Sequence, residues 1–309
     1  MLSKLKHNNV VSIVGFNDEF GKIIIYKHET IGSLDTFLRD PNLTWMRRLQ
    51  ICVGVAHGLG YIYYDKGRDF SVIHCDIRSS KILLDANWEA KLSGFELSMK
   101  QASRGRNDLC FTDVCGTLGY RDPVYDKSGS VTHKSDMYSF GIVLFEVLCG
   151  KKAVDEEDNR LLAPIAKSHY EGGGLDVMID PGLHKQMDPR SFQIFSEVAY
   201  YCLKEERSQR PNINQVVMNL EKALEYQWKH VNRLILKASF EGTTSKNLKG
   251  KDIKHLEIPL TDIENATKNF AKTYVIGSGG YGEKRNPSVQ PQKSSSRNLK
   301  KHYLFKREI

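Results

Sequence analysis

Two kinds of hydrophobic pattern follow one another along the chain. Short apolar runs of strand length occur early, at Val10–Gly15 and Lys22–Tyr26. Longer stretches with helical spacing follow, at Trp45–Lys66 and at Pro211–Trp228, where a proline opens the run. The most apolar run, Tyr138–Cys149, contains an acid and is too short to span a bilayer, so it predicts a buried helix. The pattern predicts a chain with a small β part followed by a larger helical part.

One polar segment lies between two short apolar runs. Val72–Asp85 reads VIHCDIRSSKILLD, and its polar centre carries His74, Asp76, Arg78 and Lys81. A polar loop that two strands hold in place is typical of a segment that presents reactive side chains on a rigid base.

This segment resembles the catalytic loop of plant receptor-like serine/threonine kinases, H-R-D-L-K-x-x-N-I-L-L-D. His74 and Asp76 match the family pattern, and Arg78 stands in place of its Lys. Cys75 replaces the Arg, and Lys81 replaces the Asn that binds metal in the family. The resemblance implies catalytic roles for Asp76 and Arg78, with degenerate positions at Cys75 and Lys81.

A second motif departs from the family in the same way. Lys91–Ser98, KLSGFELS, is similar to the family's K-L-S-D-F-G-L-S, and Phe95 is retained. Gly94 stands where the family has the Asp that binds magnesium, and Glu96 replaces a Gly. Magnesium prefers oxygen ligands, and neither Gly94 nor Lys81 offers one. We therefore expect no metal site here, although the family has one.

The resemblance also implies structural roles outside the loop. In relatives His74 packs against Phe95, and the counterpart of Asp136 holds the backbone of the catalytic loop. The segment Gly116–Tyr125, GTLGYRDPVY, matches the family except at its ninth residue, a Val where the family has Glu. That Glu pairs with the counterpart of Arg210, so we expect this ion pair to be missing. The preceding segment resembles an activation loop, whose candidate phosphorylation sites are Ser103, Thr112 and Thr117.

The fold class that the resemblance implies is α+β, a protein-kinase-like fold that consists mainly of the helical C-lobe with a remnant of the β-rich N-lobe. We expect a kinase-like domain over residues 1–229, with the partial N-lobe at 1–29 and the C-lobe at 30–229. A linker is predicted for 230–256, the truncated start of a second kinase-like domain for 257–283, and a basic disordered tail for 284–309. Since the first domain would lack most of its small lobe, we expect Leu2, Ile13 and Ile24 to lose their usual cover.

Two segments are candidates for binding nucleotide. By resemblance, the adenine of ATP would meet the backbone of a hinge at Lys27, His28 and Glu29. The candidate second domain carries a glycine loop, whose residues are Gly277, Gly279 and Gly282. Neither segment has the family's phosphate-binding Lys beside it. We therefore expect weak ATP binding at most, and no productive magnesium site.

Several readings of these residues remain open. Asp76 can act as a general base or can cap its own loop, and Lys81 can face solvent or fill the place of the second cation. The chain is accordingly a catalytically impaired pseudokinase that works as a binding or regulatory module, an active serine/threonine kinase, or a truncated product without function. The first and third of these fit the exchanged residues better than the second.

Composition narrows the partners that we expect. The net charge is +8, but residues 284–309 contain eight Lys/Arg and one acid, so +7 lies in this tail and only +1 in the remaining 283 residues. We therefore predict no nucleic-acid partner. Because the most apolar run is too short to span a bilayer, we also predict no membrane span in this chain and a cytoplasmic location. The predicted partners are other signalling proteins, such as receptor-like kinases, with the inner face of the plasma membrane reached through them. Six cysteines without a regular framework favour reduced thiols, and a zinc site of Cys110 and Cys115 with His74 or His133 does not match the common spacings.

Overall fold

The structure, a computed structural model, describes residues 2–17, 23–64, 67–102, 109–155 and 157–244. Residues 1–236 form one compact unit, which carries the sites discussed below. The helices of the described residues are α1 (Trp45–Tyr64), α2 (Pro123–Ser128), α3 (His133–Cys149), α4 (Leu162–Glu171), α5 (Pro181–His184), α6 (Pro189–Cys202) and α7 (Ile213–Thr244). Short 3₁₀ helices occur at Leu2–Lys4, Leu34–Phe37, Ser79–Lys81, Phe95–Leu97, Leu175–Met178 and Arg207–Gln209.

The strands form small antiparallel sheets, and two of them lie next to the polar loop. The strands are β1 (Ile13–Asn17), β2 (Ile23–Tyr26), β3 (Gly32–Ser33), β4 (Phe70–Ile73), β5 (Ile82–Leu84), β6 (Ala90–Leu92), β7 (Met99–Ala102), β8 (Cys110–Phe111) and β9 (Ser130–Val131). β4 pairs with β7, while β5 lies between β3 and β6. The polar loop therefore begins in one sheet and ends in another, which fixes both of its ends.

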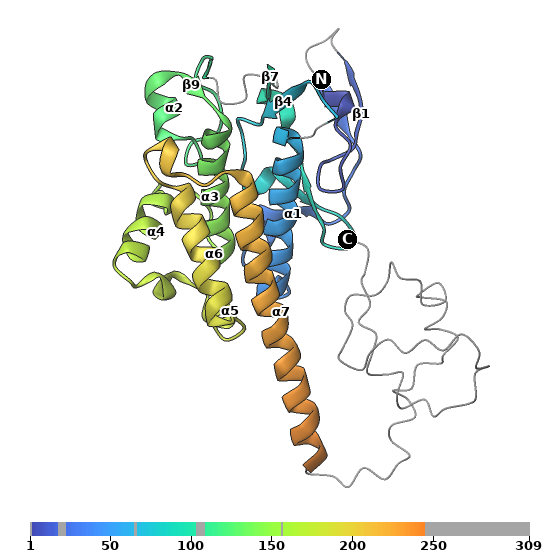
Figure 1. Ribbon diagram of the computed structural model, residues 1–309, viewed down its shortest axis with the longest axis vertical. Coiled ribbons are helices and arrows are strands. Elements are labelled where there is room, and N and C mark those ends of the chain that lie inside the picture. The colour runs from blue at the N-terminus through green and yellow to red at the C-terminus, as the bar shows by residue number, and fades with distance from the viewer. Residues whose placement is uncertain (1, 18–22, 65–66, 103–108, 156, 245–309) are drawn as a thin grey trace, which may run out of the picture. The chain divides into compact units, whose positions relative to one another are not determined.

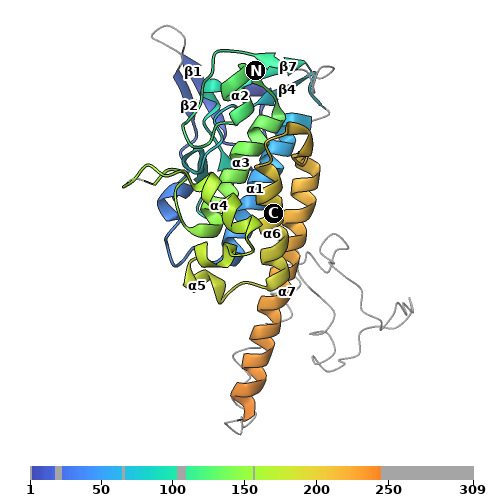
Figure 2. The same ribbon diagram turned by 90° about the vertical axis from the view of Figure 1, so that its left-hand side faces the viewer.

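Helix α3 is the centre of the core. Almost every residue of α3 is buried, because its apolar sequence leaves no polar face. A capping box of Thr132 and Ser135 starts the helix, and Gly150 ends it in the left-handed conformation. Gly141 allows α6 to approach closely, since a Cβ at this position would lie 2.6 Å from Cβ of Cys202. Figures 1 and 2 both show α3 beside α6, with α1 and α7 on the same side of the unit.

The N-terminal segment attaches to this helical body through a short backbone contact. Val10 forms a bridge with Leu92 of β6, and Val11 N–H donates to the Leu92 carbonyl at 3.0 Å. Leu2, in the first 3₁₀ helix, and Ile13 and Ile24, in the adjacent β1–β2 hairpin, are half-buried. In the same hairpin Val14, Ile23 and Ile25 are exposed by 70%, 51% and 51%. An exposed apolar surface is thus present as expected, but its residues are the sequence neighbours of those that we named from the sequence. Alternate residues of a strand face opposite sides, so Ile23 and Ile25 share the open face.

Most of the sequence-based expectations for this unit are confirmed. The α+β, kinase-like architecture is present, as are the helices expected at 45–66 and 138–149 and the strands on both sides of the loop. The end predicted for the closing helix, Trp228, is wrong, because α7 continues to Thr244, and the domain bounds at 229 and 230 stay predictions. Residues 229–236 contain no glycine or proline, so nothing in this stretch ends the helix. The second kinase-like start (257–283) and the tail (284–309) lie outside the described residues.

The helices of the described residues include none that combines the length and the apolar composition needed to cross a membrane.

Candidate active site

The backbone of the loop is held by one buried carboxylate. Asp136, on the first turn of α3, accepts hydrogen bonds from His74 N–H at 2.7 Å, Cys75 N–H at 2.9 Å and the Tyr63 hydroxyl at 2.9 Å. Burial raises the pKa of Asp136 to about 6, although these three donors oppose the shift. Cys75 has φ +68°, a left-handed conformation that residues other than glycine rarely adopt. The anchoring role expected for Asp136 is what the geometry provides.

His74 is a packing residue with both ring nitrogens in use. Its ring lies 4.9 Å from that of Phe95, and its Nε2 lies 2.8 Å from the Ser93 carbonyl oxygen. Its Nδ1 accepts from the Asp76 amide at 3.3 Å, so Nε2 carries the proton that is donated to Ser93. The side chain is fully buried, and burial lowers the pKa of His74 to about 4. A neutral imidazole in this place ties the loop to the Lys91–Ser98 segment.

Asp76 has a polar neighbour at each of its oxygens. Oδ1 accepts from the Thr117 hydroxyl at 2.7 Å, and Oδ2 lies 3.4 Å from Nε of Arg78. The side chain is 8% exposed, so little of the carboxylate is open to solvent. Asp76 therefore joins the loop to the segment after β8, and Arg78 supplies the neighbouring positive charge. This arrangement suits either reading of Asp76, as a general base or as a structural acceptor.

Lys81 lies where a side chain at position 94 would lie. Gly94 has φ +83°, and a Cβ built there would approach Cδ of Lys81 to 2.3 Å, Cγ to 2.8 Å and Cε to 2.9 Å. Atoms cannot approach so closely, so the lysine stem and a side chain at 94 exclude each other. The two exchanged family positions are thus one spatial feature. The missing carboxylate makes the room that the lysine fills.

The ammonium of Lys81 has its own carboxylate. Nζ lies 3.2 Å from Oε2 of Glu96, and the Tyr26 hydroxyl donates to the other oxygen of Glu96 at 3.1 Å. Phe95 N–H in turn donates to the Tyr26 hydroxyl at 3.2 Å. Burial opposes ionisation of Glu96, but its own amide, Lys81 and Tyr26 together lower the pKa of this group. We call Tyr26, Lys81, Gly94 and Glu96 the lysine latch.

The residues at this place do not fit a magnesium ion. Gly94 has no side-chain oxygen, and Lys81 brings a positive charge to the position from which the family binds metal. Within the described residues, no group of three or more His, Cys, Asp or Glu side chains is arranged to hold a metal ion. The zinc site considered for Cys110 and Cys115 has no support among these residues either, since Nε2 of His74 is already bonded to Ser93.

The candidate nucleotide contacts are only partly open. Lys27 and His28 are exposed and Glu29 is buried, but the Lys27 amide already donates to the Ser12 carbonyl at 2.8 Å. The structure does not bring Lys27, His28 or Glu29 together with a phosphate-binding group among the described residues. Gly277, Gly279 and Gly282 lie outside the described residues.

The candidate phosphorylation sites fall into three situations. Ser103 lies outside the described residues. Thr112 is half-buried beside β8, and its amide donates to the Gly129 carbonyl at 3.1 Å. The hydroxyl of Thr117 is engaged with Asp76, so phosphorylation there requires that contact to break.

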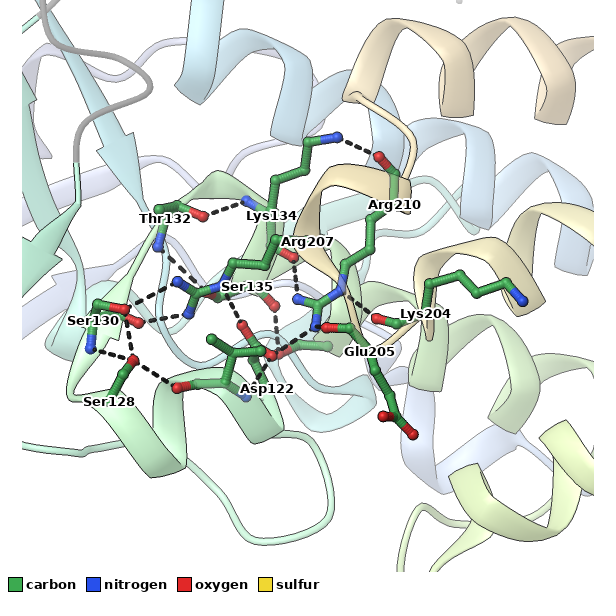
Figure 3. Close-up of polar contacts among 12 residues, drawn as sticks. Asp122, Ser128, Ser130, Thr132, Lys134, Ser135, Lys204, Glu205, Arg207 and Arg210 are labelled. Atoms are coloured by element: carbon green, nitrogen blue, oxygen red, sulfur yellow. Dashed lines mark hydrogen bonds and ion pairs between the residues drawn. The ribbon is translucent and has the colours of Figure 1, made fainter.

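The Glu–Arg pair is missing as expected from Val124, but Arg210 has another ion-pair partner. Its Nη2 lies 2.8 Å from Oδ1 of Asp122, with both side chains fully buried, and Nε of Arg207 lies 2.9 Å from Oδ2. Asp122 also caps α2 by accepting from Val124 N–H at 3.0 Å. Figure 3 shows how the guanidinium groups of Arg207 and Arg210 converge on this carboxylate. Arg210 thus pairs with the acid two residues before Val124, a position at which the chain matches the family pattern.

The carboxylate of Asp122 can stay ionised in the core because several groups donate hydrogen bonds to it. Burial disfavours its charge, but the hydrogen bond and charge of Arg210, together with Arg207 and Ser135, lower the pKa of Asp122. The remaining donors of Arg210 reach the carbonyls of Lys134 and Lys204. All of these contacts link α2, α3 and the segment before α7 in one polar cluster (Figure 3).

Sequence reasoning missed three contributors. Glu96 was noted only as a lost glycine, and Tyr26 only as the end of a strand, although both complete the lysine latch. Asp122 was not named as a partner of Arg210. A usable signal existed for Asp122, because Asp followed by Pro is a common start of a helix and fixes the side chain at a cap.

Comparisons with known proteins agree with this architecture. The protein kinase domain family matches residues 1–220. Similar relatives, all from Arabidopsis thaliana, include the receptor-like protein kinases ANXUR2 (39% identical over 234 residues), FERONIA (38% over 234) and ANXUR1 (37% over 234). The matches cover 74% of this chain and 27%, 26% and 27% of those three proteins, so the chain spans about a quarter of their length.

The fold and the loop therefore define a protein kinase domain. The chain belongs to the plant receptor-like protein kinase family.

Proposed function

We propose that this chain is a catalytically impaired pseudokinase that acts as a binding or regulatory module in signalling. The observation that carries the proposal is the lysine latch, in which the stem of Lys81 fills the place of a side chain at Gly94. The ammonium of Lys81 forms an ion pair with Glu96, and this ion pair holds the lysine at its position.

The reason is electrostatic. Phosphoryl transfer needs little covalent work from the protein and depends on positioned charge, most of all on the metal ions that bridge the phosphates. At this site a fixed cation takes the place of two oxygen ligands. General-base help of the kind that Asp76 could give is typically worth about 10²–10⁴-fold, which is a small part of the rate enhancement that kinases need.

An active serine/threonine kinase remains the second candidate, and Asp76 is the observation that favours it. This carboxylate is retained, lies beside Arg78 and is 8% exposed. An active enzyme would have to hold the phosphates of ATP without the carboxylate at 94, with Arg78 as the nearby cation.

A phosphate-transfer assay separates the two candidates. The unmodified chain and its Asp76→Ala variant are incubated with γ-labelled ATP, magnesium or manganese, and a generic protein substrate. The pseudokinase proposal predicts equal, background-level label for both proteins. Transfer by the unmodified chain that disappears in Asp76→Ala overturns the proposal and establishes the active kinase. Circular dichroism of both proteins ensures that the variant is folded.

The remaining features of this proposal concern partners and place. We expect weak ATP binding at the 27–29 hinge, without a dependence on magnesium. We expect the partners to be other signalling proteins, receptor-like kinases among them, in the cytoplasm and at the inner face of the plasma membrane through those partners. The similar relatives are named receptor-like protein kinases, which supports the expectation of partners in signalling.

A further inference from the structure

Three half-buried cysteines lie around one small apolar cluster beside the candidate active site. The cluster is formed by the buried side chains of Ile73, Tyr125 and Val131, and Cys75, Cys110 and Cys115 pack against it. The other cysteines, Cys52, Cys149 and Cys202, are buried in the main core. One of the three thiols belongs to the catalytic-type loop, and the other two belong to the segment that follows β7.

The backbones around Cys75 and Cys115 run in contact. A Cβ at Gly116 would lie only 2.9 Å from the carbonyl oxygen of Cys75, and Gly116 has φ +106°, so only glycine permits this approach. One residue further along, the Thr117 hydroxyl donates to Asp76 at 2.7 Å. Two successive contacts thus hold residues 115–117 along residues 75–76.

Each of the two thiols is oriented by a hydrogen bond. Sγ of Cys115 lies 3.4 Å from the Tyr125 hydroxyl, which also accepts from the Cys115 amide at 3.2 Å. Sγ of Cys75 donates to the Ile73 carbonyl at 3.7 Å, on the same cluster. The Tyr125 hydroxyl is itself fixed, because it donates to the Asp113 carbonyl at 2.9 Å.

A shared metal ion is not what this arrangement favours. In the part of the chain that the structure describes, the thiols do not converge with other ligands on one metal position. A disulfide requires two cysteines whose Cα atoms lie within about 7 Å and whose Cβ atoms face each other. The contact between residue 116 and the Cys75 carbonyl brings the two backbones together, which is the proximity that such a bond starts from, whereas a metal would need further ligands.

We propose that Cys75 and Cys115 are a modification site, at which a peroxide forms a reversible disulfide between the catalytic-type loop and the following segment. The sulfur of Cys115 attacks a peroxide oxygen, the O–O bond breaks, and water leaves as sulfenic acid forms. The sulfur of Cys75 then attacks that of Cys115, the S–O bond breaks, and the thiol proton leaves with the hydroxyl as a second water. Two thiols are oxidised, and one peroxide is reduced.

The order of these steps follows from the surroundings of Cys75. Burial, together with the nearby Asp136 carboxylate, raises the pKa of the Cys75 thiol, which makes it a poor first nucleophile. Cys115 lies on the segment beyond Asp113 and Val114, both of which are exposed. We therefore assign the first attack on peroxide to Cys115 and the resolution of the sulfenic acid to Cys75.

The bond would have a mechanical consequence. It would hold residues 115–117 on the loop and keep the Thr117–Asp76 contact closed, independently of whether the site transfers phosphate. Reduction by a thiol such as glutathione would release the segment again. This inference does not depend on the proposed function.

The test uses the whole chain treated with hydrogen peroxide, quenched with an alkylating reagent and digested without reductant. We expect a cross-linked peptide that contains Cys75 and Cys115, a loss of about 2 Da from the two hydrogens released, and reversal by dithiothreitol. The Cys115→Ser and Cys75→Ser variants should lose the cross-link completely. The matched control Cys110→Ser, a thiol on the same cluster, should keep it.

Two results overturn the inference. One is a cross-link that survives in Cys115→Ser and disappears in Cys110→Ser, because the pair would then be a different one. The other is full alkylation of Cys75 and Cys115 after peroxide treatment of the folded chain. Circular dichroism checks that each variant is folded, and where Cys75→Ser does not fold, the comparison of Cys115→Ser with Cys110→Ser still decides.

Discussion

The lysine latch predicts that the costs of changing positions 81 and 94 depend on each other. Replacing Gly94 by Asp in the unmodified chain places a Cβ where Cδ of Lys81 lies, 2.3 Å away, and expels the lysine stem. The change should lose the Lys81–Glu96 ion pair, worth about 0.2–1 kcal/mol for a partly exposed pair. It should also lose part of the packing of three methylenes, about 1–2 kcal/mol, and add about 1 kcal/mol for a left-handed residue that is not glycine.

The same change should be cheaper after Lys81 is removed. Lys81→Asn alone should destabilise by about 1–2 kcal/mol, since it loses the ion pair and the packing of the stem. In that background Gly94→Asp should add only the backbone cost of about 1 kcal/mol. The double variant should therefore be about 1–3 kcal/mol more stable than the sum of the single changes predicts, a coupling energy above the error of such cycles.

Urea denaturation followed by tryptophan fluorescence measures these differences, because Trp45 is fully buried and reports on the core. Lys81→Met is the matched control, since it keeps the stem and loses only the charge. It should cost less than about 1 kcal/mol and should leave the penalty of Gly94→Asp high. Single changes whose costs add within about 0.5 kcal/mol would refute the mutual exclusion of the two side chains.

Three further outcomes are expected. His74 has its pKa lowered to about 4 from an ordinary 6.5, so its contribution to stability is complete above pH 6.5 and is lost as the pH falls towards 4. His74→Phe should therefore reduce the loss of unfolding free energy between pH 7 and acid pH by up to about 3 kcal/mol. Urea titrations at pH 7 and pH 5 measure this loss, and the same loss in both proteins would contradict the prediction. Asp122→Ala should destabilise by about 3–5 kcal/mol in the same titrations because it leaves a buried guanidinium unpaired, and a loss below about 1 kcal/mol would count against the buried pair. The exposed β2 residues Ile23 and Ile25 should bind a hydrophobic dye, and the Ile23→Lys/Ile25→Lys variant should lose most of that fluorescence; equal dye binding by both proteins would place the apolar surface elsewhere.

The sequence was sufficient for the parts of the fold that repeat a local pattern. The apolar runs on both sides of the loop became β4 and β5, and the run without a polar face became the buried helix α3. Asp136 could be assigned because its role depends on the family's helix and loop, both of which were recognisable. The end of α7 was missed because a change in composition near residue 231 was taken for a linker, although no helix-breaking residue is present there.

The relations that sequence could not predict are those between side chains far apart along the chain. Lys81 and Gly94 are separated by 12 residues, and their exclusion follows from the turn between β5 and β6 that returns the chain to the same place. Glu96 becomes meaningful only beside the ammonium that it neutralises. In the same way, Arg210 keeps a carboxylate because the cap of α2 and the segment before α7 meet, which Val124 alone could not indicate.

The two kinds of polar contact differ in what they stabilise. The side chains of Asp136, His74 and Arg210 form hydrogen bonds with backbone groups of the chain, so these contacts stabilise the fold without a ligand. The family's ligands at positions 81 and 94 would instead interact with an ion; here position 94 is a glycine, and the charge of Lys81 is balanced by Glu96 inside the chain. A site that no longer needs an ion to balance its charges can keep a stable kinase-like surface without nucleotide. The proposed role as a binding module rests on this balance of charge, which lets the exchanges coexist with an intact core.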